Sequence, residues 1–418
     1  MKILFIHQNF PGQFKFIAPA LASRGHEVKA LCITTKLELN WQGVEIRKYK
    51  VVGDLTAGQN PFLSEIETKL IRASSCFMEC MTLKEAGFKP DVIVAHPGWG
   101  ESLRVKNCWP HSKLINYCEY FYKNKNADVN FDPEFSNGSL DDAFRVEFKN
   151  VNNLLNMEVS DFGISPTEWQ KSLYPKWYQE KIKVIHDGID TEICKPNNNA
   201  YLKLKKNNKE IKLTKKNKVI TFINRNLEPY RGYHIFMRSL AKILSTESDL
   251  VVLIIGGDGV SYGFEPEEKK YGAKTWKDIF VNEVKNQISE EQWSRVYFLG
   301  NVEYKHYLSI LQISTVHVYL TYPFVLSWSL LEAMSVGCAV VASDTAPVKE
   351  VIRNNENGLL VDFFQPIEIS EAVLTLLNDD STRQRLSNEA RETIRSKYDL
   401  NTVCLKEQIL FIENIQTH

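Results

Sequence analysis

The chain has 418 residues, enough for two domains that each bury a core of their own. Lysine and arginine number 51, and so do aspartate and glutamate, so the formal net charge at pH 7 is zero. The composition therefore shows no basic surplus that would indicate a nucleic acid partner, and no apolar run approaches the ~20 residues of a transmembrane helix. The eight cysteines are scattered, and no second pair or histidine completes a zinc-binding set with Cys76 and Cys80. We expect reduced, mostly buried cysteines, no bound metal and a cytoplasmic protein.

The first 190 residues alternate between short apolar segments and helical ones, as in a parallel α/β sheet. A strand over 1–7 leads through the loop 8–14 into a helix over 15–24. The loop contains Gly12, and a glycine lets the backbone approach a ligand at the carboxyl edge of such a sheet. One glycine is a weak signal, and the absence of a G-x-G-x-x-G pattern counts against an NAD-binding domain.

Two further strands of this half deliver polar residues to the same edge. The strand over 91–96 ends in His96, and the strand over 113–118 is followed by Glu119. Because α/β sheets bind ligands at this edge, we interpret His96 and Glu119 as site residues; the alternative is that they only cap local turns. The loop over 123–142 is polar and rich in Asn and Asp, and we interpret it as a mobile lid on the acceptor side.

A change of composition separates the two halves of the chain. Before it, helices are predicted over 60–87 and 140–159, and strands over 162–165 and 182–185. Residues 191–218 are rich in lysine and asparagine and poor in apolar residues, so we interpret them as a linker and surface excursion. We expect the lysine run over 203–218 to be a solvated face; the alternative is a peripheral contact with anionic headgroups at the inner face of a membrane.

Strand alternation resumes at residue 219. Strands are predicted over 219–223, 250–255, 296–299 and 316–320. The first leads into a loop with Arg225 and Arg231, and later strands end near Gly257, Gly300 and Val302. Because the carboxyl ends of parallel strands meet at one edge, we expect these residues to converge. Two guanidinium groups beside a glycine-rich loop indicate a diphosphate, which they bind through paired hydrogen bonds.

A helix that ends at Gly337 follows the last of these strands, and it begins near Ser327 and Ser329. Free amides and the helix dipole favour a phosphate at such a terminus. Glu332 lies about one turn further along, at roughly 1.5 Å per residue, which is suitable for a ribose next to a diphosphate. The alternative is a glutamate on a half-exposed helix face.

Six segments, in this order and spacing, resemble the retaining glycosyltransferases of family 4. They are FIHQNFPGQF (5–14), SPTEWQKSLYP (165–175), VIHDGID (184–190), NRNLEPYRG (224–232), FLGNV (298–302) and SLLEAMSVGCAVVASD (329–344). The resemblance covers nearly the whole chain and implies an α/β GT-B fold, in which two Rossmann-like, doubly wound domains face each other across a cleft. It implies an N-terminal acceptor domain (1–190), a C-terminal nucleotide-sugar domain (219–395) and a C-terminal helix (396–418) that crosses back to the N-terminal domain.

The resemblance also implies roles for individual residues. Arg225 and Arg231 would hold the donor diphosphate, and Glu332 would hold the ribose hydroxyls. The remaining expected donor-binding positions are Gly12, Gly257, Gly300, Val302, Ser327, Trp328 and Ser329. Glu119 stands at the strand end where the family has a histidine, and His96 stands one strand earlier, so both are expected catalytic residues of the N-terminal domain.

One departure from the family pattern bears on function. The family often has two glutamates seven residues apart, and the position of the first is Phe324 here. We expect retaining transfer of a sugar from a UDP-sugar, or alternatively a GDP-sugar, to a carbohydrate, lipid-linked or protein acceptor, by a monomer or homo-oligomer without a further cofactor. The alternatives are a non-catalytic partner subunit of an active glycosyltransferase, and a nucleotide-sugar 2-epimerase.

Overall fold

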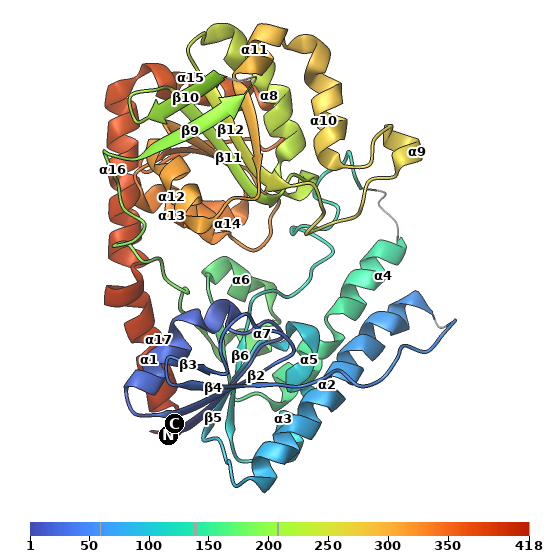
Figure 1. Cartoon of the computed structure of the whole chain (residues 1–418). Helices are drawn as coiled ribbons and strands as arrows, with labels where there is room; N and C mark the ends of the chain where they lie inside the picture. The colour runs from blue at the N-terminus through green and yellow to red at the C-terminus, as the bar shows by residue number, and fades with distance from the viewer. Residues whose placement is uncertain (59, 137–139, 207–208, 418) are drawn as a thin grey trace. The chain divides into compact units, whose positions relative to one another are not determined.

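The chain forms two compact units (Figure 1). The computed structural model describes residues 1–58, 60–136, 140–206 and 209–417. Unit 1 comprises Met1–Gly188 and Leu400–His418, and unit 2 comprises Ile189–Asp399. Unit 2 is therefore inserted into unit 1 along the chain.

Unit 1 is built on an eight-stranded sheet in the order β3-β4-β2-β1-β5-β6-β7-β8. The strands are β1 (Lys2–Ile6), β2 (Glu27–Cys32), β3 (Asn40–Trp41), β4 (Val44–Lys48), β5 (Val92–Ala95), β6 (Lys113–Tyr117), β7 (Phe162–Ser165) and β8 (Ile182–Val184). All neighbouring pairs are parallel except β3 with β4. The central strands are apolar and buried because helices cover both faces of a parallel sheet.

The helices of unit 1 include its C-terminal segment. They are α1 (Ile17–Ser23), α2 (Pro61–Glu85), α3 (Val105–Cys108), α4 (Leu140–Lys149), α5 (Val151–Val159), α6 (Glu168–Leu173), α7 (Lys176–Gln179) and α17 (Leu405–Glu413). Ile412 and Ile415 pack into the same core as β1, and Glu413 binds Arg24 at 2.7 Å. The C-terminal segment thus contributes Ile412 and Ile415 to the unit 1 core.

The single helix predicted over 140–159 is wrong, because α4 and α5 are separate helices that meet at Asn150. The side chain of Asn150 accepts a hydrogen bond from Tyr122 N at 2.9 Å and donates one to Tyr122 O at 2.8 Å. This contact with a distant segment offers the side chain partners outside the helix, and such competition is typical of asparagine at helix boundaries.

Unit 2 is built on a six-stranded, fully parallel sheet in the order β13-β12-β11-β14-β15-β16. The strands are β11 (Val219–Asn226), β12 (Val251–Gly257), β13 (Val296–Gly300), β14 (Val316–Tyr319), β15 (Ala339–Ser343) and β16 (Leu359–Val361). The helices are α8 (Tyr233–Thr246), α9 (Glu268–Tyr271), α10 (Trp276–Val284), α11 (Glu290–Ser294), α12 (Tyr304–Ile313), α13 (Trp328–Ser335), α14 (Ala346–Lys349), α15 (Pro366–Asn378) and α16 (Asp380–Lys397).

The stretch predicted as a linker contains a β-hairpin that belongs to unit 2. Its strands are β9 (Tyr201–Lys206) and β10 (Lys209–Thr214), and residues 207–208 of the lysine run lie outside the described residues. Leu213 is buried in the unit 2 core, and Leu202 packs against it. Alternate apolar residues of the hairpin thus reach the core while the lysines between them face solvent.

Each sheet has a point where the strand order reverses, and ligands bind there in open α/β sheets. In unit 1 the chain runs from β1 outward through β2, and returns to β5 on the other side, so the switch lies between β1 and β5. In unit 2 the order places the switch between β11 and β14. Among the predicted site residues, Gly12, His96, Arg231 and Ser327 lie in the loops after β1, β5, β11 and β14, respectively. The others lie at or just after the ends of β6, β11, β12 and β13, or in α13.

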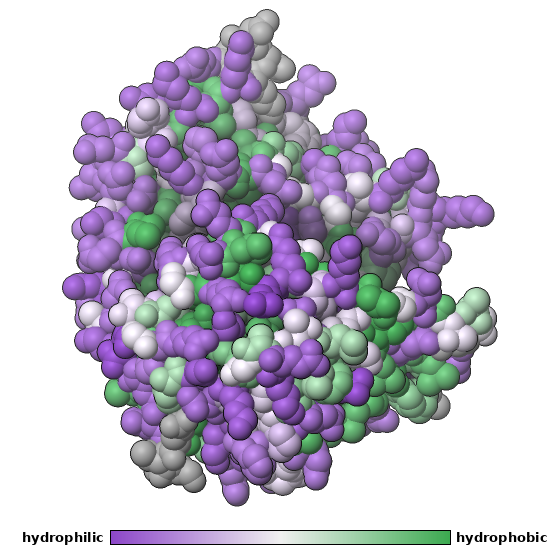
Figure 2. All heavy atoms as spheres, turned by 60° about the horizontal axis from the view of Figure 1, so that its bottom comes forward, coloured by the Kyte–Doolittle hydropathy of each residue, from purple (hydrophilic) through white to green (hydrophobic). Residues whose placement is uncertain are grey.

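Among the helices of the described residues, none combines the length and apolarity needed to span a bilayer. On the face drawn in Figure 2, hydrophobic residues are interspersed with hydrophilic ones. All eight cysteines are buried, as predicted.

Candidate active site

Four side chains form a hydrogen-bonded chain at the switch point of unit 1. His7 Nε2 lies 2.8 Å from Gln13 Oε1, and Gln13 Nε2 donates to Glu119 Oε1 at 2.7 Å. His96 Nε2 lies 3.1 Å from Glu119 Oε2. The structure therefore brings together the two residues predicted from adjacent strand ends, and it adds His7 and Gln13, which the sequence did not single out.

Backbone donors fix the direction of these hydrogen bonds. Asn9 N donates to His7 Nδ1 at 3.0 Å, and Gly98 N donates to His96 Nδ1 at 3.2 Å. Since Nδ1 is the acceptor in each ring, a neutral ring carries its proton on Nε2. His96 then donates directly to the carboxylate of Glu119. His7 donates to Gln13, which in turn donates to the same carboxylate.

The electrostatics of the network favour an ionised Glu119. Burial, and then the neighbouring His96, lower the pKa of His7 to about 4. Burial raises the pKa of Glu119, but the hydrogen bond from His96 and the charges of both histidines outweigh it, so the pKa lies below its ordinary value. The carboxylate of Glu119 is thus the negative group of this site at neutral pH.

A cavity of about 330 Å³ opens beside this network, within the size range of small-molecule sites. His96, Trp99 and Glu119 line it together with residues of α2 and α5. The ring of Trp99 stacks on His96 with centroids 4.2 Å apart, which leaves an aromatic wall next to the carboxylate. A polar acceptor beside an aromatic wall suits the hydroxyls and the apolar face of a polyol or sugar.

Gly12 lies against the His7 ring. Its φ is +47°, and a Cβ atom there would lie 2.2 Å from His7 Nε2. Only glycine fits this position without displacing the imidazole.

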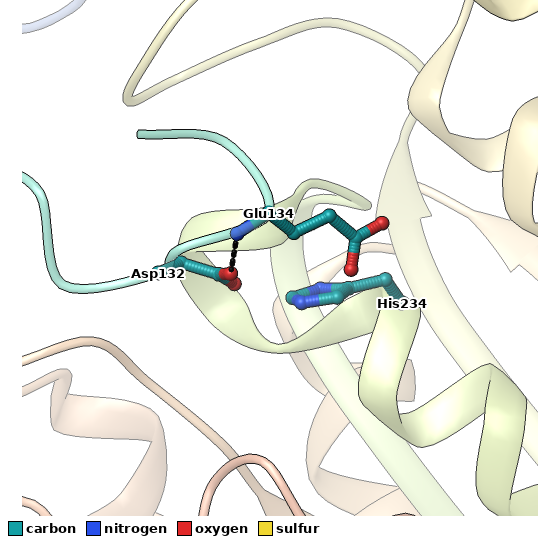
Figure 3. Close-up of side chains that lie close together, drawn as sticks. All are labelled: Asp132, Glu134 and His234. Carbon is teal, nitrogen blue, oxygen red and sulfur yellow. Dashed lines mark hydrogen bonds between the residues drawn. The ribbon is translucent and has the colours of Figure 1, made fainter. Parts of the chain in front are cut away.

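The described part of the loop predicted over 123–142 is held by local polar contacts. Asp132 Oδ1 accepts a hydrogen bond from Glu134 N at 3.0 Å (Figure 3), and Tyr120 Oη donates to Asp128 Oδ1 at 2.6 Å. Residues 137–139 of this loop lie outside the described residues. Its role as a lid stays a prediction.

Arg231 lies at the switch point of unit 2, in the loop after β11. Its Nη1 donates to Thr321 Oγ1 at 2.8 Å and to Val325 O at 3.3 Å, both in the loop after β14. The guanidinium also lies 5.1 Å from the ring centre of Tyr262 and 5.8 Å from that of Phe324. These contacts hold the buried guanidinium in one place while leaving it positively charged.

Arg225 and Gly257 end the neighbouring strands β11 and β12. Arg225 is exposed, and the next residue, Asn226, is paired with Gly257. A Cβ atom on Gly257 would lie 2.6 Å from Asn226 Oδ1, so the two strand ends meet closely. A neighbouring carboxyl, Glu228, accepts hydrogen bonds from Ser261 N and Tyr262 N, and burial raises its pKa to about 7.

Gly300 and Val302 lie at and just after the end of β13. Gly300 has a φ of +62°, and a Cβ atom there would meet no atom within 4 Å. Val302 is half-buried and packs against the unit 2 core. Gly300 thus has open space beside its backbone, whereas the side chain of Val302 contributes to packing.

The first residues of α13 already use part of their hydrogen-bonding capacity. Ser327 N donates to Tyr319 Oη at 3.1 Å, and Ser329 N donates to Ser327 Oγ at 3.3 Å. Trp328, between them, is 37% exposed. A phosphate bound at this terminus would therefore replace Tyr319 Oη and Ser327 Oγ as the acceptor of these amide hydrogen bonds.

Glu332 is held by two tyrosines of α12. Tyr304 Oη donates to Oε1 at 2.8 Å, and Tyr307 Oη donates to Oε2 at 2.6 Å. Cys194 Sγ, 3.9 Å away, also donates to Oε1. Their i, i+3 spacing places both tyrosines on one face of α12, but only the fold brings that face to Glu332.

Two doubly wound α/β domains in one chain, each with polar groups at its switch point, define the GT-B class of glycosyltransferases. The sequence matches the model of the glycosyl transferase family 4 group over residues 24–194 and that of glycosyl transferases group 1 over residues 205–393. The chain belongs to the family 4 glycosyltransferases.

The relatives found by sequence differ in how much of their length is matched. A D-inositol 3-phosphate glycosyltransferase of Acidothermus cellulolyticus is 24% identical over 93% of this chain and 82% of its own length. The protein of the same name from Corynebacterium efficiens is 24% identical over 52% of this chain and 47% of its own length. The chain thus spans only about half the length of several curated relatives that it matches.

Solved structures share the fold at low sequence identity. Sucrose-phosphate synthase from Thermosynechococcus elongatus matches with a TM-score of 0.73 and 14% identity, with 100% of both chains covered. HepE from Anabaena, solved in complex with UDP, matches with a TM-score of 0.68 and 17% identity over 100% of both chains.

Proposed function

We propose that the chain transfers a sugar from a nucleotide-diphosphate sugar to a hydroxyl acceptor with retention of the anomeric configuration. The observation that carries the proposal is Arg231, a buried guanidinium held at the switch point of unit 2, beside the loop that leads into α13. A fixed positive charge at a strand-end crevice suits a diphosphate. UDP is the favoured nucleotide because HepE, with the same fold, was solved with UDP.

In the proposed reaction, unit 2 binds the donor and unit 1 binds the acceptor. The bond between the anomeric carbon and the diphosphate oxygen breaks as the acceptor oxygen bonds to the same face of the sugar. The acceptor proton passes to the leaving diphosphate oxygen. Arg225 and Arg231 stabilise the negative charge that develops on this leaving group, which is the largest single contribution expected.

Glu119 is the proposed acceptor-binding group. Its ionised carboxylate accepts a hydrogen bond from the acceptor hydroxyl and orients the oxygen for attack. Gln13 and His96 hold the carboxylate in place. The acceptor is a polyol or carbohydrate, free or lipid-linked, because the cavity combines a carboxylate with the Trp99 ring.

Glu332 is proposed to bind the ribose. A ribose hydroxyl would donate to this carboxylate, while Tyr304 and Tyr307 keep it oriented. The remaining backbone positions, at Gly257, Gly300 and the start of α13, would line the donor.

Phe324 supports a second candidate, a partner subunit that binds nucleotide but does not catalyse. The Phe324 ring packs against Tyr262 with centroids 4.8 Å apart, where the resemblance implies a glutamate that touches the donor sugar. Such a protein would keep the diphosphate site and lose turnover.

The test is calorimetric titration of the chain with UDP and GDP, followed by incubation with UDP-glucose and myo-inositol and NMR of the product. Binding of UDP and an α-linked product support the proposal. Binding without transfer or hydrolysis, across a panel of UDP- and GDP-sugars with carbohydrate, polyol and lipid-linked acceptors, supports the partner subunit. Absence of binding by either nucleotide contradicts both.

A further inference from the structure

The cavity of unit 1 has a cationic wall that the transfer reaction, as described, does not use. One wall is the face of α2 that carries Glu65, Thr68, Lys69 and Arg72. Their i, i+3, i+4, i+7 spacing places all four on one side of the helix. Lys149, the last residue of α4, also lines the cavity, so three cationic side chains border it.

The central cation of this wall is held out of solvent. The side chain of Lys69 is only 11% exposed, and its Nζ lies 3.3 Å from Glu65 Oε1 and 3.4 Å from Lys149 O. Burial lowers the pKa of Lys69, and the charges of Lys149 and Arg72 lower it further, against the opposing effect of Glu65. The three cations therefore repel one another in a partly desolvated space.

Counter-charges within the cavity are few. The two carboxylates that line it are Glu65, which binds Lys69, and Glu119, which receives Gln13 and His96. Within the described part of the chain, no hydrogen bond or ion pair engages the Arg72 guanidinium. Burial raises the pKa of Glu101, and the charge of Arg72 opposes this increase. An added anion would relieve the repulsion and give Arg72 a partner.

We propose that the acceptor is a phosphorylated polyol whose phosphate binds Lys69, Arg72 and Lys149 while a hydroxyl of the same molecule faces Glu119. Three cations suit a doubly charged phosphate, and a guanidinium binds it through two parallel hydrogen bonds. The inference rests on the proposed function, because it names the acceptor class of that same site.

The phosphate has two chemical sources, a free sugar or polyol phosphate and the headgroup of a lipid. Phe62, Phe144 and Phe148 form a ring cluster beside the cavity, with centroids 5.2 Å apart for Phe62 and Phe144 and 4.5 Å apart for Phe144 and Phe148. Phe144 is 45% exposed, and Glu65 lines both the cavity and the space beside Phe62 and Phe148. An acyl chain next to the headgroup would cover these rings.

The test measures acceptor binding directly, without nucleotide. The full chain is titrated with myo-inositol 1-phosphate and with myo-inositol in a calorimeter, and its sedimentation is measured with phosphatidylcholine vesicles that contain or lack phosphatidylinositol. We expect Arg72→Gln to weaken binding of the phosphorylated probe by about 10- to 100-fold, as for loss of charged hydrogen bonds, and to leave myo-inositol unaffected. Lys149→Gln, at a half-buried position on a different helix, should act in the same direction.

Lys89→Gln, an exposed change after α2, is the matched control and should change nothing. Preference for inositol phosphate alone assigns a free acceptor, and preference for the phosphatidylinositol vesicles alone assigns a lipid headgroup. Equal binding with and without phosphate in both arms, by a chain that still binds UDP, overturns this inference and leaves the proposed function standing. If the chain does not bind UDP but still prefers myo-inositol 1-phosphate to myo-inositol, and Arg72→Gln removes this preference, only the proposed function is overturned.

Discussion

The switch points of the two units have the same topology and opposite chemistry. Between β1 and β5, His96 and Gln13 donate hydrogen bonds to the carboxylate of Glu119, and His7 donates one to Gln13. Between β11 and β14, the guanidinium of Arg231 is held by a hydroxyl, a carbonyl and two aromatic rings. One edge presents a hydrogen-bond acceptor and the other presents donors. The doubly wound sheet thus fixes where a ligand binds, whereas the loops determine the charge of the groups that contact it.

The largest expected effect is at the switch point of unit 2, which is proposed to bind the sugar donor. Arg231→Ala should lower turnover by about 10²-fold or more, because it removes a fixed donor to the leaving diphosphate. The measurement is kcat with a UDP-sugar, with Arg395→Ala, an exposed arginine of α16, as control. Near-normal turnover in Arg231→Ala would remove this residue from the mechanism.

At the switch point of unit 1, which is proposed to bind the sugar acceptor, Glu119→Gln should lower kcat by about 10- to 100-fold, as for loss of a hydrogen bond to a charged group. The KM for the donor should stay unchanged, since Glu119 belongs to the other unit. Gln13→Glu places a second carboxylate beside Glu119 and should reproduce the loss through repulsion. A raised donor KM in Glu119→Gln would contradict the division of labour between the edges.

The close packing of Gly12 against His7 is tested by comparing an alanine substitution at Gly12 with one at Gly25. Gly12→Ala should lower the free energy of unfolding by about 1–3 kcal/mol, because the new Cβ strains a left-handed backbone and displaces His7. In Gly25→Ala the φ of +87° is similarly unfavourable, but no atom lies within 4 Å of the new Cβ. Denaturant unfolding of both variants isolates the contact with His7, and equal losses would show that backbone strain alone matters.

The smallest effect concerns acid stability. Burial lowers the pKa of His7, His186 and His317 to about 4, and two of these histidines lie in unit 1. Between pH 6.5 and 4 the unfolded chain takes up protons that the folded chain does not, so the free energy of unfolding falls as the pH falls. Unit 1 should therefore lose protection from hydrogen exchange before unit 2.

His186→Asn keeps an acceptor for Gly188 N and should flatten this pH dependence, whereas the exposed His111→Asn should not. An unchanged slope in His186→Asn would exclude His186 as a source of acid sensitivity.

The sequence predicted the fold well because alternation and turn residues are local signals. It also placed His96 and Glu119 at adjacent strand ends, where the structure joins them by a hydrogen bond. The division of the helix at Asn150 was not predictable, because it depends on a hydrogen bond to Tyr122 from a distant segment. The hairpin over 201–214 was missed because its apolar residues are sparse and lysines separate them.

The site residues that could not be predicted from the sequence are likewise defined by contacts between segments far apart in the chain. Gln13 is an ordinary loop residue until the fold places Glu119 beside it. Tyr304 and Tyr307 show only a helical spacing, and nothing in that spacing points to Glu332. Lys69 and Arg72 lie on one face of a helix, and nothing in their spacing points to the cavity that this face borders.

The insertion of unit 2 into unit 1 has a consequence for biosynthesis. Ile189 and Asp399, at the two ends of unit 2, pair as neighbours, so this unit is complete as one continuous stretch. The core of unit 1 instead requires Ile412 and Ile415. During translation, unit 2 can therefore fold before unit 1, whose core is incomplete until Ile412 and Ile415 have left the ribosome.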